Sequence, residues 1–304
     1  MTTATGESIA NPSNQDHDNP WKEALEYYFK DAMALLFSMV HQAIDWNQPP
    51  EFLDKELQKI LAKAERGKTY ADKLVKVKLI SGEETWLLIH IEVQGEPEHD
   101  FAQRMFNYNS RIRQRYKKDV ISLAILSDTS PTFKPQTYHY NALGFNLRMD
   151  YPVVKLLDFL PQRQSLLTGE NVFGLLVLAQ LDAKLLKTPQ ERLSAKVALI
   201  RQLYERGYSK EQIITLFNLI DWMITLPKEL VIEFDHQIDA IEQEKNMQYI
   251  NSLEDLYLER GKLEGRLEQA IEMIREFNLS VEIVAERCHL SIKELKERLS
   301  QIEK

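Results

Sequence analysis

The hydrophobic pattern changes its period along the first half of the chain, and this constrains the fold more than any other feature. Apolar residues recur every three or four positions from Trp21 to Ile44, which predicts a helix, and the same pattern over Glu51–Arg66 predicts a second one. From Leu74 the period becomes two. Strands are therefore expected over Leu74–Ile80 and Trp86–Gln94, joined by a turn at Ser81–Glu84 into a β-hairpin.

The pattern then returns to helix and ends in a buried strand. Pro97–Lys118 predicts a helix, and Val120–Leu126 is an almost unbroken apolar run of the kind found in strands covered on both faces. One or two further short strands are expected between Thr137 and Leu157, and the chain looks helical from Leu166 onward. We therefore expect an α/β fold with a mixed sheet flanked by helices, followed by an all-α C-terminal region.

Four segments follow from these patterns. Residues 1–20 are polar and aperiodic, which indicates a disordered arm, and residues 21–165 form the α/β domain. Residues 166–238 form a helical region, with helix ends at Thr188-Pro189, Gly207 and Pro227. Residues 239–304 hold a charged helix to about Phe277 and a tail with the outline of a helix-turn-helix.

Composition narrows the class of protein. The chain has 304 residues, 44% of them hydrophobic, and a single cysteine, which excludes an internal disulfide framework and fits a reducing cytoplasm. The N-terminus has no signal-peptide pattern, and no apolar run approaches the roughly 20 residues of a membrane span. The net charge of −8 argues against a nonspecific polycation, although an acidic body can still carry a basic groove.

The strongest chemical constellation is Asp72 with Glu92 and Gln94. Asp72 begins the first predicted strand, whereas Glu92 and Gln94 end the second and project from one face of it. Counting along the hairpin predicts that Asp72 faces Glu92 at its open end. Two carboxylates there could hold Mg²⁺ or Mn²⁺, which activates water and stabilises charge on a phosphodiester. The alternative is that these acids flank strand ends and stay solvated.

A basic stripe lies on the predicted helix that follows. The segment from Phe101 to Lys118 contains no acidic residue, and Arg104, Tyr108, Arg111 and Arg115 fall on one helical face. Such a stripe suits contact with DNA phosphates, and Arg104 is the member nearest the proposed metal site. The alternative is a solvated face whose arginines pair with acids elsewhere.

One nucleotide-binding pattern is excluded by its context. Gly67-Lys68-Thr69 ends a relaxed P-loop pattern, but a P-loop needs a strand before it and a helix after it. Here the predicted order is reversed, so no nucleotide cofactor is expected.

Three segments carry a family resemblance. The runs Tyr70-Ala71-Asp72-Lys73-Leu74-Val75-Lys76-Val77, Leu87-Leu88-Ile89-His90-Ile91-Glu92-Val93-Gln94 and Phe101-Ala102-Gln103-Arg104-Met105-Phe106-Asn107-Tyr108 resemble the Rpn family of recombination-promoting nucleases, also described as transposases. That family belongs to the PD-(D/E)XK nuclease superfamily. The resemblance covers roughly residues 20–160, and the stretch Glu259–Gly265 with the tail after it also looks like the ends of such proteins.

The resemblance implies a restriction-endonuclease-like fold and a Mg²⁺-dependent DNA endonuclease. Asp72 and Glu92 would be metal ligands, and Gln94 would replace the catalytic lysine, which removes a positive charge from the site. Ala71 stands in place of the proline of the superfamily name. A further carboxylate from the early helices often joins such sites, and Glu56 is our choice, with Glu26 and Glu51 as rivals.

Three readings of the whole chain remain open after this resemblance, the last of them a helical adaptor whose C-terminal half docks a partner while the N-terminal half serves as a scaffold. The first is the endonuclease, with DNA as partner and a homodimer as an attractive arrangement because two sites are needed to cut both strands. The second is a catalytically weak or inactive nuclease-fold protein that binds DNA or protein, which the Gln94 substitution and the acidic tail motivate.

Overall fold

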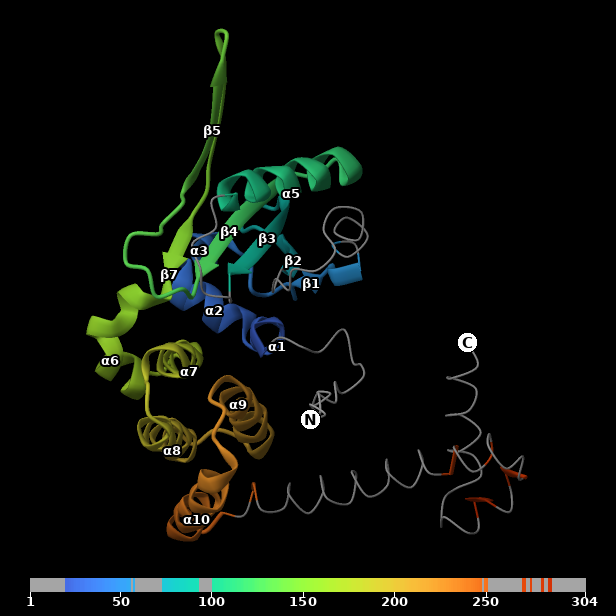
Figure 1. Ribbon diagram of the computed structural model, residues 1–304. Helices are drawn as coiled ribbons and strands as arrows, with labels where there is room; N and C mark the ends of the chain where they lie inside the picture. Colours follow the sequence, from blue (N-terminus) through green and yellow to red (C-terminus); the bar gives the residue numbers. More distant parts are fainter. Residues whose placement is uncertain are drawn as a thin grey trace, which may run out of the picture. The chain divides into compact units, whose positions relative to one another are not determined.

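The computed structural model describes residues 20–55, 57, 73–92, 100–247, 249–250, 270–271, 274, 280–281 and 284–285. The chain divides into two compact units, residues 1–234 and 235–304. The first unit contains both sheets and the helices up to Met223, and helix α10 (Lys228–Lys245) crosses the boundary between the units (Figure 1). Of the predicted helix-turn-helix tail, only scattered residues belong to the described set, and the segment Gly67–Thr69 lies outside it.

A mixed five-stranded sheet forms the centre of the first unit. Its strands are β1 (Glu51–Phe52), β2 (Lys73–Lys78), β3 (Glu84–Glu92), β4 (Val120–Leu126) and β7 (Val153–Lys155), in that spatial order. The first three pair antiparallel, whereas β4 and β7 run parallel to β3. The predicted hairpin, the predicted buried strand and the mixed α/β class are therefore confirmed.

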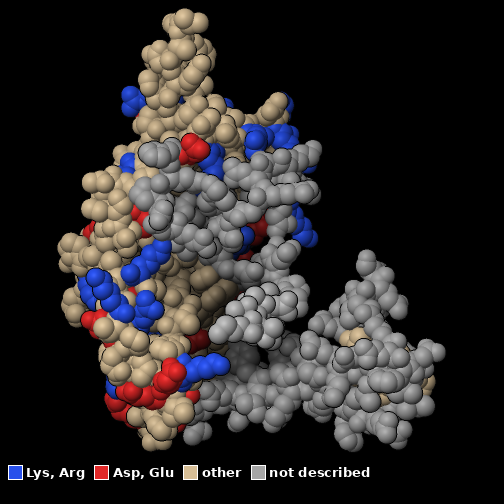
Figure 2. Space-filling model, viewed as in Figure 1, with Lys and Arg blue, Asp and Glu red and all other residues tan. Residues whose placement is uncertain are grey.

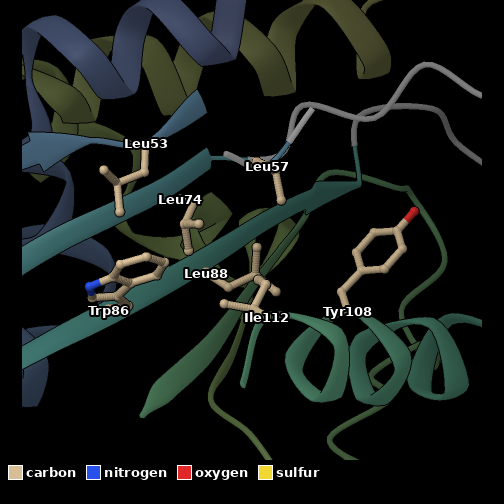
Figure 3. Packing of buried hydrophobic residues seen from close by; sticks show 7 residues of the cluster. All are labelled: Leu53, Leu57, Leu74, Trp86, Leu88, Tyr108 and Ile112. Atoms are coloured by element: carbon tan, nitrogen blue, oxygen red, sulfur yellow. The ribbon is translucent and has the colours of Figure 1, made fainter. Parts of the chain in front are cut away.

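Helix α5 (Phe101–Tyr116) covers one face of this sheet, as its predicted span indicated. It is the crossover between the parallel strands β3 and β4. Figure 3 shows the cluster that joins α5 to the hairpin, which consists of Leu53, Leu57, Leu74, Trp86, Leu88, Tyr108 and Ile112. Fully burying a side chain such as Leu88 stabilises a fold by about 1.5–3 kcal/mol, so this cluster is a principal contributor to the α/β core.

The predicted single helix from Trp21 to Ile44 is wrong. Three short helices occur instead, α1 (Pro20–Tyr27), α2 (Phe29–Leu36) and α3 (Ser38–Ala43). The interruptions fall at Tyr28 and Phe37, which have non-helical backbone angles. Nine positions separate these two residues, so an ideal helix would point them in opposite directions. The breaks allow both aromatic side chains to be buried.

The predicted start of the second helix is also wrong. Glu51 and Phe52 form strand β1 against β2, and the Leu53 N–H donates to the Leu74 carbonyl at 2.7 Å. Helical backbone begins only at Asp54. The open edge of β2 offers backbone hydrogen bonds that the local helical pattern does not take into account.

The segment of sequence that connects β4 to β7 forms a second, two-stranded sheet. Strands β5 (Thr137–Ala142) and β6 (Phe145–Asp150) pair antiparallel and project away from the central sheet (Figure 1). With β7, this region contains three strands rather than the predicted one or two. We call this projecting element the β5–β6 hairpin.

From Leu156 to Lys245 the structure is mainly helical, with the predicted helix ends. The elements are η1 (Leu156–Gln162), α6 (Arg163–Thr168), α7 (Phe173–Leu185), α8 (Pro189–Glu205), α9 (Lys210–Met223) and α10 (Lys228–Lys245). Helix α7 packs on α1, since the Trp21 and Phe173 rings are in edge contact and Trp21 Nε1 donates to Gln180 Oε1 at 2.8 Å. None of the described helices is long and apolar enough to cross a membrane.

The charged helix predicted to run from Asp239 to Phe277 is wrong in its described part. Helix α10 ends at Lys245, and Asn246 adopts a left-handed conformation with φ of 52°. The Met247 N–H donates to the Glu242 carbonyl, and the Glu242 side chain accepts the N–H groups of Tyr249 and Ile250. Asparagine tolerates this conformation, and it serves as a helix stop.

Candidate functional site

The carboxyl ends of β3, β4 and β7 lie together at one edge of the central sheet. Glu92, Leu126 and Lys155 are the last residues of these strands and pair with one another in a single row. Neighbouring strands are about 4.8 Å apart, so the Cα atoms of Glu92 and Lys155 are separated by about 10 Å. In open α/β sheets, ligands bind outside the carboxyl ends of parallel strands. This edge is therefore the candidate active site.

Three of the predicted site residues, Asp72, Gln94 and Glu56, lie outside the described residues. Glu92 is described as the final residue of β3. The observed register places Lys73 opposite Ile89. Asp72 facing Glu92 would require Lys73 opposite Ile91, so the predicted pairing is displaced by two residues. A shift of two residues preserves which side chains share a face.

Two carboxylates from the N-terminal part of the chain bind a lysine of β2, whereas a carboxylate from this region was expected to join the metal site. Lys73 Nζ donates to Glu26 Oε2 at 2.8 Å and to Asp54 Oδ2 at 2.7 Å. The Lys73 side chain is buried, and its ammonium lies 5.1 Å from the centroid of the Phe52 ring. Glu51, the other rival for the additional acid, pairs with Lys76. Both rivals therefore neutralise lysines of β2. No sequence pattern pointed to Asp54.

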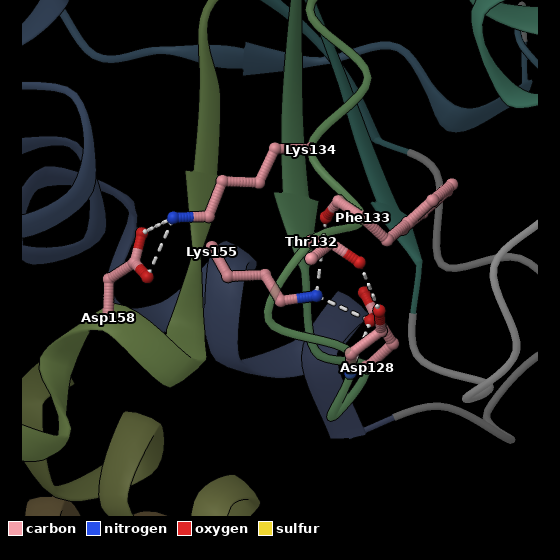
Figure 4. A network of polar contacts seen from close by, with 7 residues as sticks. Asp128, Thr132, Phe133, Lys134, Lys155 and Asp158 are labelled. Carbon is pink, nitrogen blue, oxygen red and sulfur yellow. Dashed lines mark hydrogen bonds and ion pairs between the residues drawn. The ribbon is translucent and has the colours of Figure 1, made fainter.

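A buried ion pair joins the ends of β4 and β7 (Figure 4). Asp128 pairs with the Lys155 ammonium, which also donates to the Phe133 carbonyl at 3.4 Å. The same carboxylate oxygen, Oδ1, accepts the Ser130 N–H at 2.9 Å. Two charges so deeply buried are tolerated because they compensate each other. Sequence reasoning missed both residues, although an acidic residue two positions after a buried strand was an available signal.

Arg104 lies at this end of the molecule but in its interior. It occupies the first turns of α5, it is only 5% exposed, and its guanidinium carbon lies 5.3 Å from the Phe101 ring centroid. Burial raises the pKa of Tyr151 well above its ordinary value, while the positive charge of Arg104 acts in the opposite direction. Arg104 is thus a buried cation close to the carboxyl edge.

The other members of the predicted stripe differ from Arg104. Tyr108 is buried in the α5 cluster, whereas Arg111 and Arg115 are exposed. Eleven residues of helix correspond to about 16 Å, so Arg115 lies that far along α5 from Arg104. The C-terminal half of α5 is anchored at the start of β4, where Asn109 Nδ2 donates to the Val120 carbonyl at 2.9 Å.

The exposed basic residues form a patch on α5 and the residues that follow it. Figure 2 shows Lys and Arg side chains gathered over this helix. We call them the α5 basic patch, and they are Arg111, Arg113, Arg115, Lys117 and Lys118. Arg113 pairs with Asp119 at 3.2 Å. The sequence predicted these exposed cations, because the helix contains no acid that could pair with them internally.

The described residues contain no group of three or more His, Cys, Asp or Glu side chains that could hold a metal ion. The predicted metal ligands, Asp72 and Glu92, bind through carboxylate oxygen, which is the donor type that Mg²⁺ and Mn²⁺ prefer. Their chemistry therefore fits such an ion.

Comparisons with protein-family models, with curated proteins and with solved structures found no match to this chain.

Proposed function

We propose that the chain is a Mg²⁺- or Mn²⁺-dependent endonuclease that hydrolyses phosphodiester bonds in DNA. The observation that supports the proposal best is the position of Glu92. Glu92 is the last residue of β3. This strand pairs antiparallel with β2, which begins one residue after Asp72 in the sequence, and it pairs parallel with β4. Glu92 therefore lies at the edge of the sheet where ligands bind in open α/β folds, and Asp72 directly precedes the neighbouring strand in the sequence.

The residues have distinct roles in this proposal. Asp72 and Glu92 hold the metal ion, which when bound lowers the pKa of water and offsets charge on the phosphate. Gln94 orients the attacking water through its amide, which can donate and accept hydrogen bonds but carries no charge. Arg104 provides positive charge beside the reacting phosphate. Arg111 and Arg115 hold the DNA backbone without reading its sequence.

Lys155 supports the same proposal from the neighbouring strands. A lysine is missing at position 94, but the Lys155 ammonium is held in the row that contains Glu92. Its ion pair with Asp128 fixes its position. Because Asp128 neutralises this ammonium, Lys155 adds no net positive charge at the carboxyl edge. The ion pair supports the proposal by holding the ends of β4 and β7 in place beside the end of β3.

Plasmid nicking tests the proposal. Wild type, Asp72→Ala and Glu92→Gln are compared in Mg²⁺, in Mn²⁺ and in EDTA, with Glu51→Gln as the matched control because that exposed acid pairs with Lys76. We expect metal-dependent nicking by wild type and the control only, with circular dichroism unchanged in all four proteins.

Two results would contradict the assignment. Nicking retained by Asp72→Ala would mean that the metal site has been assigned to the wrong residues. No nicking by wild type, together with tight DNA binding in EDTA, would favour the non-catalytic binding module. Calorimetric titration with Mn²⁺ separates these cases, since a pure binding module has no need for a metal at Asp72 and Glu92.

A further inference from the structure

The β5–β6 hairpin has one apolar face and one polar face. The strands are in register, so that Tyr138 pairs with Met149, Tyr140 with Leu147 and Ala142 with Phe145. These six side chains share one face. The residues between them form the other face, which consists of Thr137, His139, Asn141, Asn146, Arg148 and Asp150. Such alternation is typical of a ribbon with one face covered.

The base of the hairpin is covered, but its tip is not. The Tyr138 ring stacks on Phe106 of α5 with centroids 4.8 Å apart, and Met149 packs on the core cluster around Phe101. At the tip, by contrast, Tyr140, Leu143 and Phe145 are 52%, 109% and 56% exposed. A two-stranded hairpin is marginally stable alone, and an exposed apolar patch of this kind marks an interaction surface.

The turn places an apolar side chain at the outermost point. Leu143 and Gly144 connect the strands with φ values of 51° and 85°. Turns of this kind favour Asn-Gly, because asparagine adopts positive φ more readily than leucine does. Leucine at this position is less favourable for the turn conformation than asparagine, and it exposes a large apolar side chain to solvent. A residue that does not stabilise its own turn in this way is typical of a contact site for another molecule.

The charge distribution indicates a polyanionic partner. No acidic residue occurs from Tyr138 to Met149 or from Phe101 to Lys118, although the chain has 46 acidic and 38 basic residues. The two segments are in contact through Tyr138 and Phe106. On the polar face of the hairpin, Arg148 pairs with Asp150 at 2.9 Å. The positive charge near the hairpin therefore comes from α5, the helix that the base of the hairpin contacts.

We infer that the β5–β6 hairpin is an arm that grips duplex DNA, with its tip inserted into a groove. Leucine and phenylalanine are among the residues that proteins use as wedges between base steps, and a β-ribbon is narrow enough to enter a groove. Tyr140, Leu143 and Phe145 contact the base pairs, while the α5 basic patch holds the adjacent phosphates. The inference rests on the proposed function for the choice of DNA as substrate, but it does not depend on cleavage.

Fluorescence anisotropy with a labelled duplex of about 30 base pairs tests this arm, in EDTA so that no cleavage occurs. The variants are Leu143→Asn, which suits the turn better while removing the apolar tip, and the double change Tyr140→Ser with Phe145→Ser. The matched control is Ile80→Asn, because Ile80 is 72% exposed in the turn of the other hairpin. We expect each tip variant to weaken binding about fivefold or more, and the control to bind like wild type.

The outcomes separate this inference from the endonuclease proposal. Tip-dependent binding without nicking in Mg²⁺ would retain the arm and reject the nuclease. Nicking and binding that are both unaffected by the tip variants would retain the nuclease and reject the arm. Absence of duplex binding by wild type would also overturn the inference. A tip variant that converts a dimer to a monomer in light scattering, with unchanged DNA affinity, would assign the tip to a second copy of the chain.

Discussion

Asp128 and Lys155 form an ion pair whose side chains are 0% and 1% exposed. The pair connects the loop after β4 to the last residue of β7, and β7 contributes only three residues to the sheet. The attachment of this edge strand therefore depends strongly on one polar contact.

Replacing Lys155 with methionine is expected to destabilise the protein by about 3–5 kcal/mol, because the Asp128 carboxylate would remain buried without its cation. Urea denaturation measures the change. Lys134→Met is the control, since Lys134 forms an exposed pair with Asp158 at 2.7 Å, which is worth about 0–1 kcal/mol. Equal losses in the two variants would contradict the structural role assigned to Lys155.

The double change Arg111→Gln with Arg115→Gln is expected to weaken DNA binding uniformly across sequences. Losing two phosphate contacts should reduce the slope of log K against log salt concentration by about 2. Folding should be unaffected, because both side chains are exposed. The control removes two exposed lysines of the helical region, Lys187→Gln with Lys228→Gln, and should leave the slope unchanged. A slope that changes equally in both double variants would point to net charge rather than to the α5 basic patch.

Asp31 makes stability depend on pH. Burial raises the pKa of this carboxyl, so the folded protein holds the proton more tightly than the unfolded chain does. The protonated Asp31 side chain favours the folded state. Its contribution to the free energy of unfolding is complete below the unfolded pKa of about 3.9, and it disappears as pH rises through the higher folded pKa. Asp31→Asn should therefore gain stability relative to wild type at pH 7. Denaturation at successively lower pH should show this advantage shrinking, and a constant difference would contradict the assignment.

Gly82 is required by the turn between β2 and β3. Its φ is 91°, and an added Cβ would meet no atom within 4 Å, so any cost of Gly82→Ala arises from the backbone alone. We expect a loss of about 1–2 kcal/mol on urea denaturation. Gly82→Asn should lose less, because asparagine tolerates this conformation. Alanine as stable as glycine would show that the turn rearranges.

Sequence pattern predicted the elements whose stability is largely local. The β2–β3 hairpin, α5 and the apolar run of β4 were evident because period, turn residues and length all agreed. The helix from Trp21 was wrong because burial of Tyr28 and Phe37 decided its breaks, and burial depends on packing partners distant in sequence. Strand β1 was missed for the same reason, since it depends on the open edge of β2.

The candidate site was predictable only in part. Glu92 could be placed at the end of its strand, because alternation and the hairpin turn both point there. Asp128 and Lys155 are far apart in sequence and meet only because β7 returns beside β4. The register was displaced by two residues because the turn begins at Leu79 rather than at Ser81, with Lys78 opposite Glu84. Turn geometry of this kind is not fixed by residue type alone.

The excursion between β4 and β7 leaves the sheet after Leu126 and returns at Val153, which pairs with Ala124. Its base is closed by the Asp128–Lys155 ion pair and by the Tyr151 N–H bonded to the Gln136 carbonyl at 3.1 Å. The segment that carries the β5–β6 hairpin therefore begins and ends at neighbouring points of the central sheet. Its length and tip can therefore vary between related chains without displacing a strand of the central sheet.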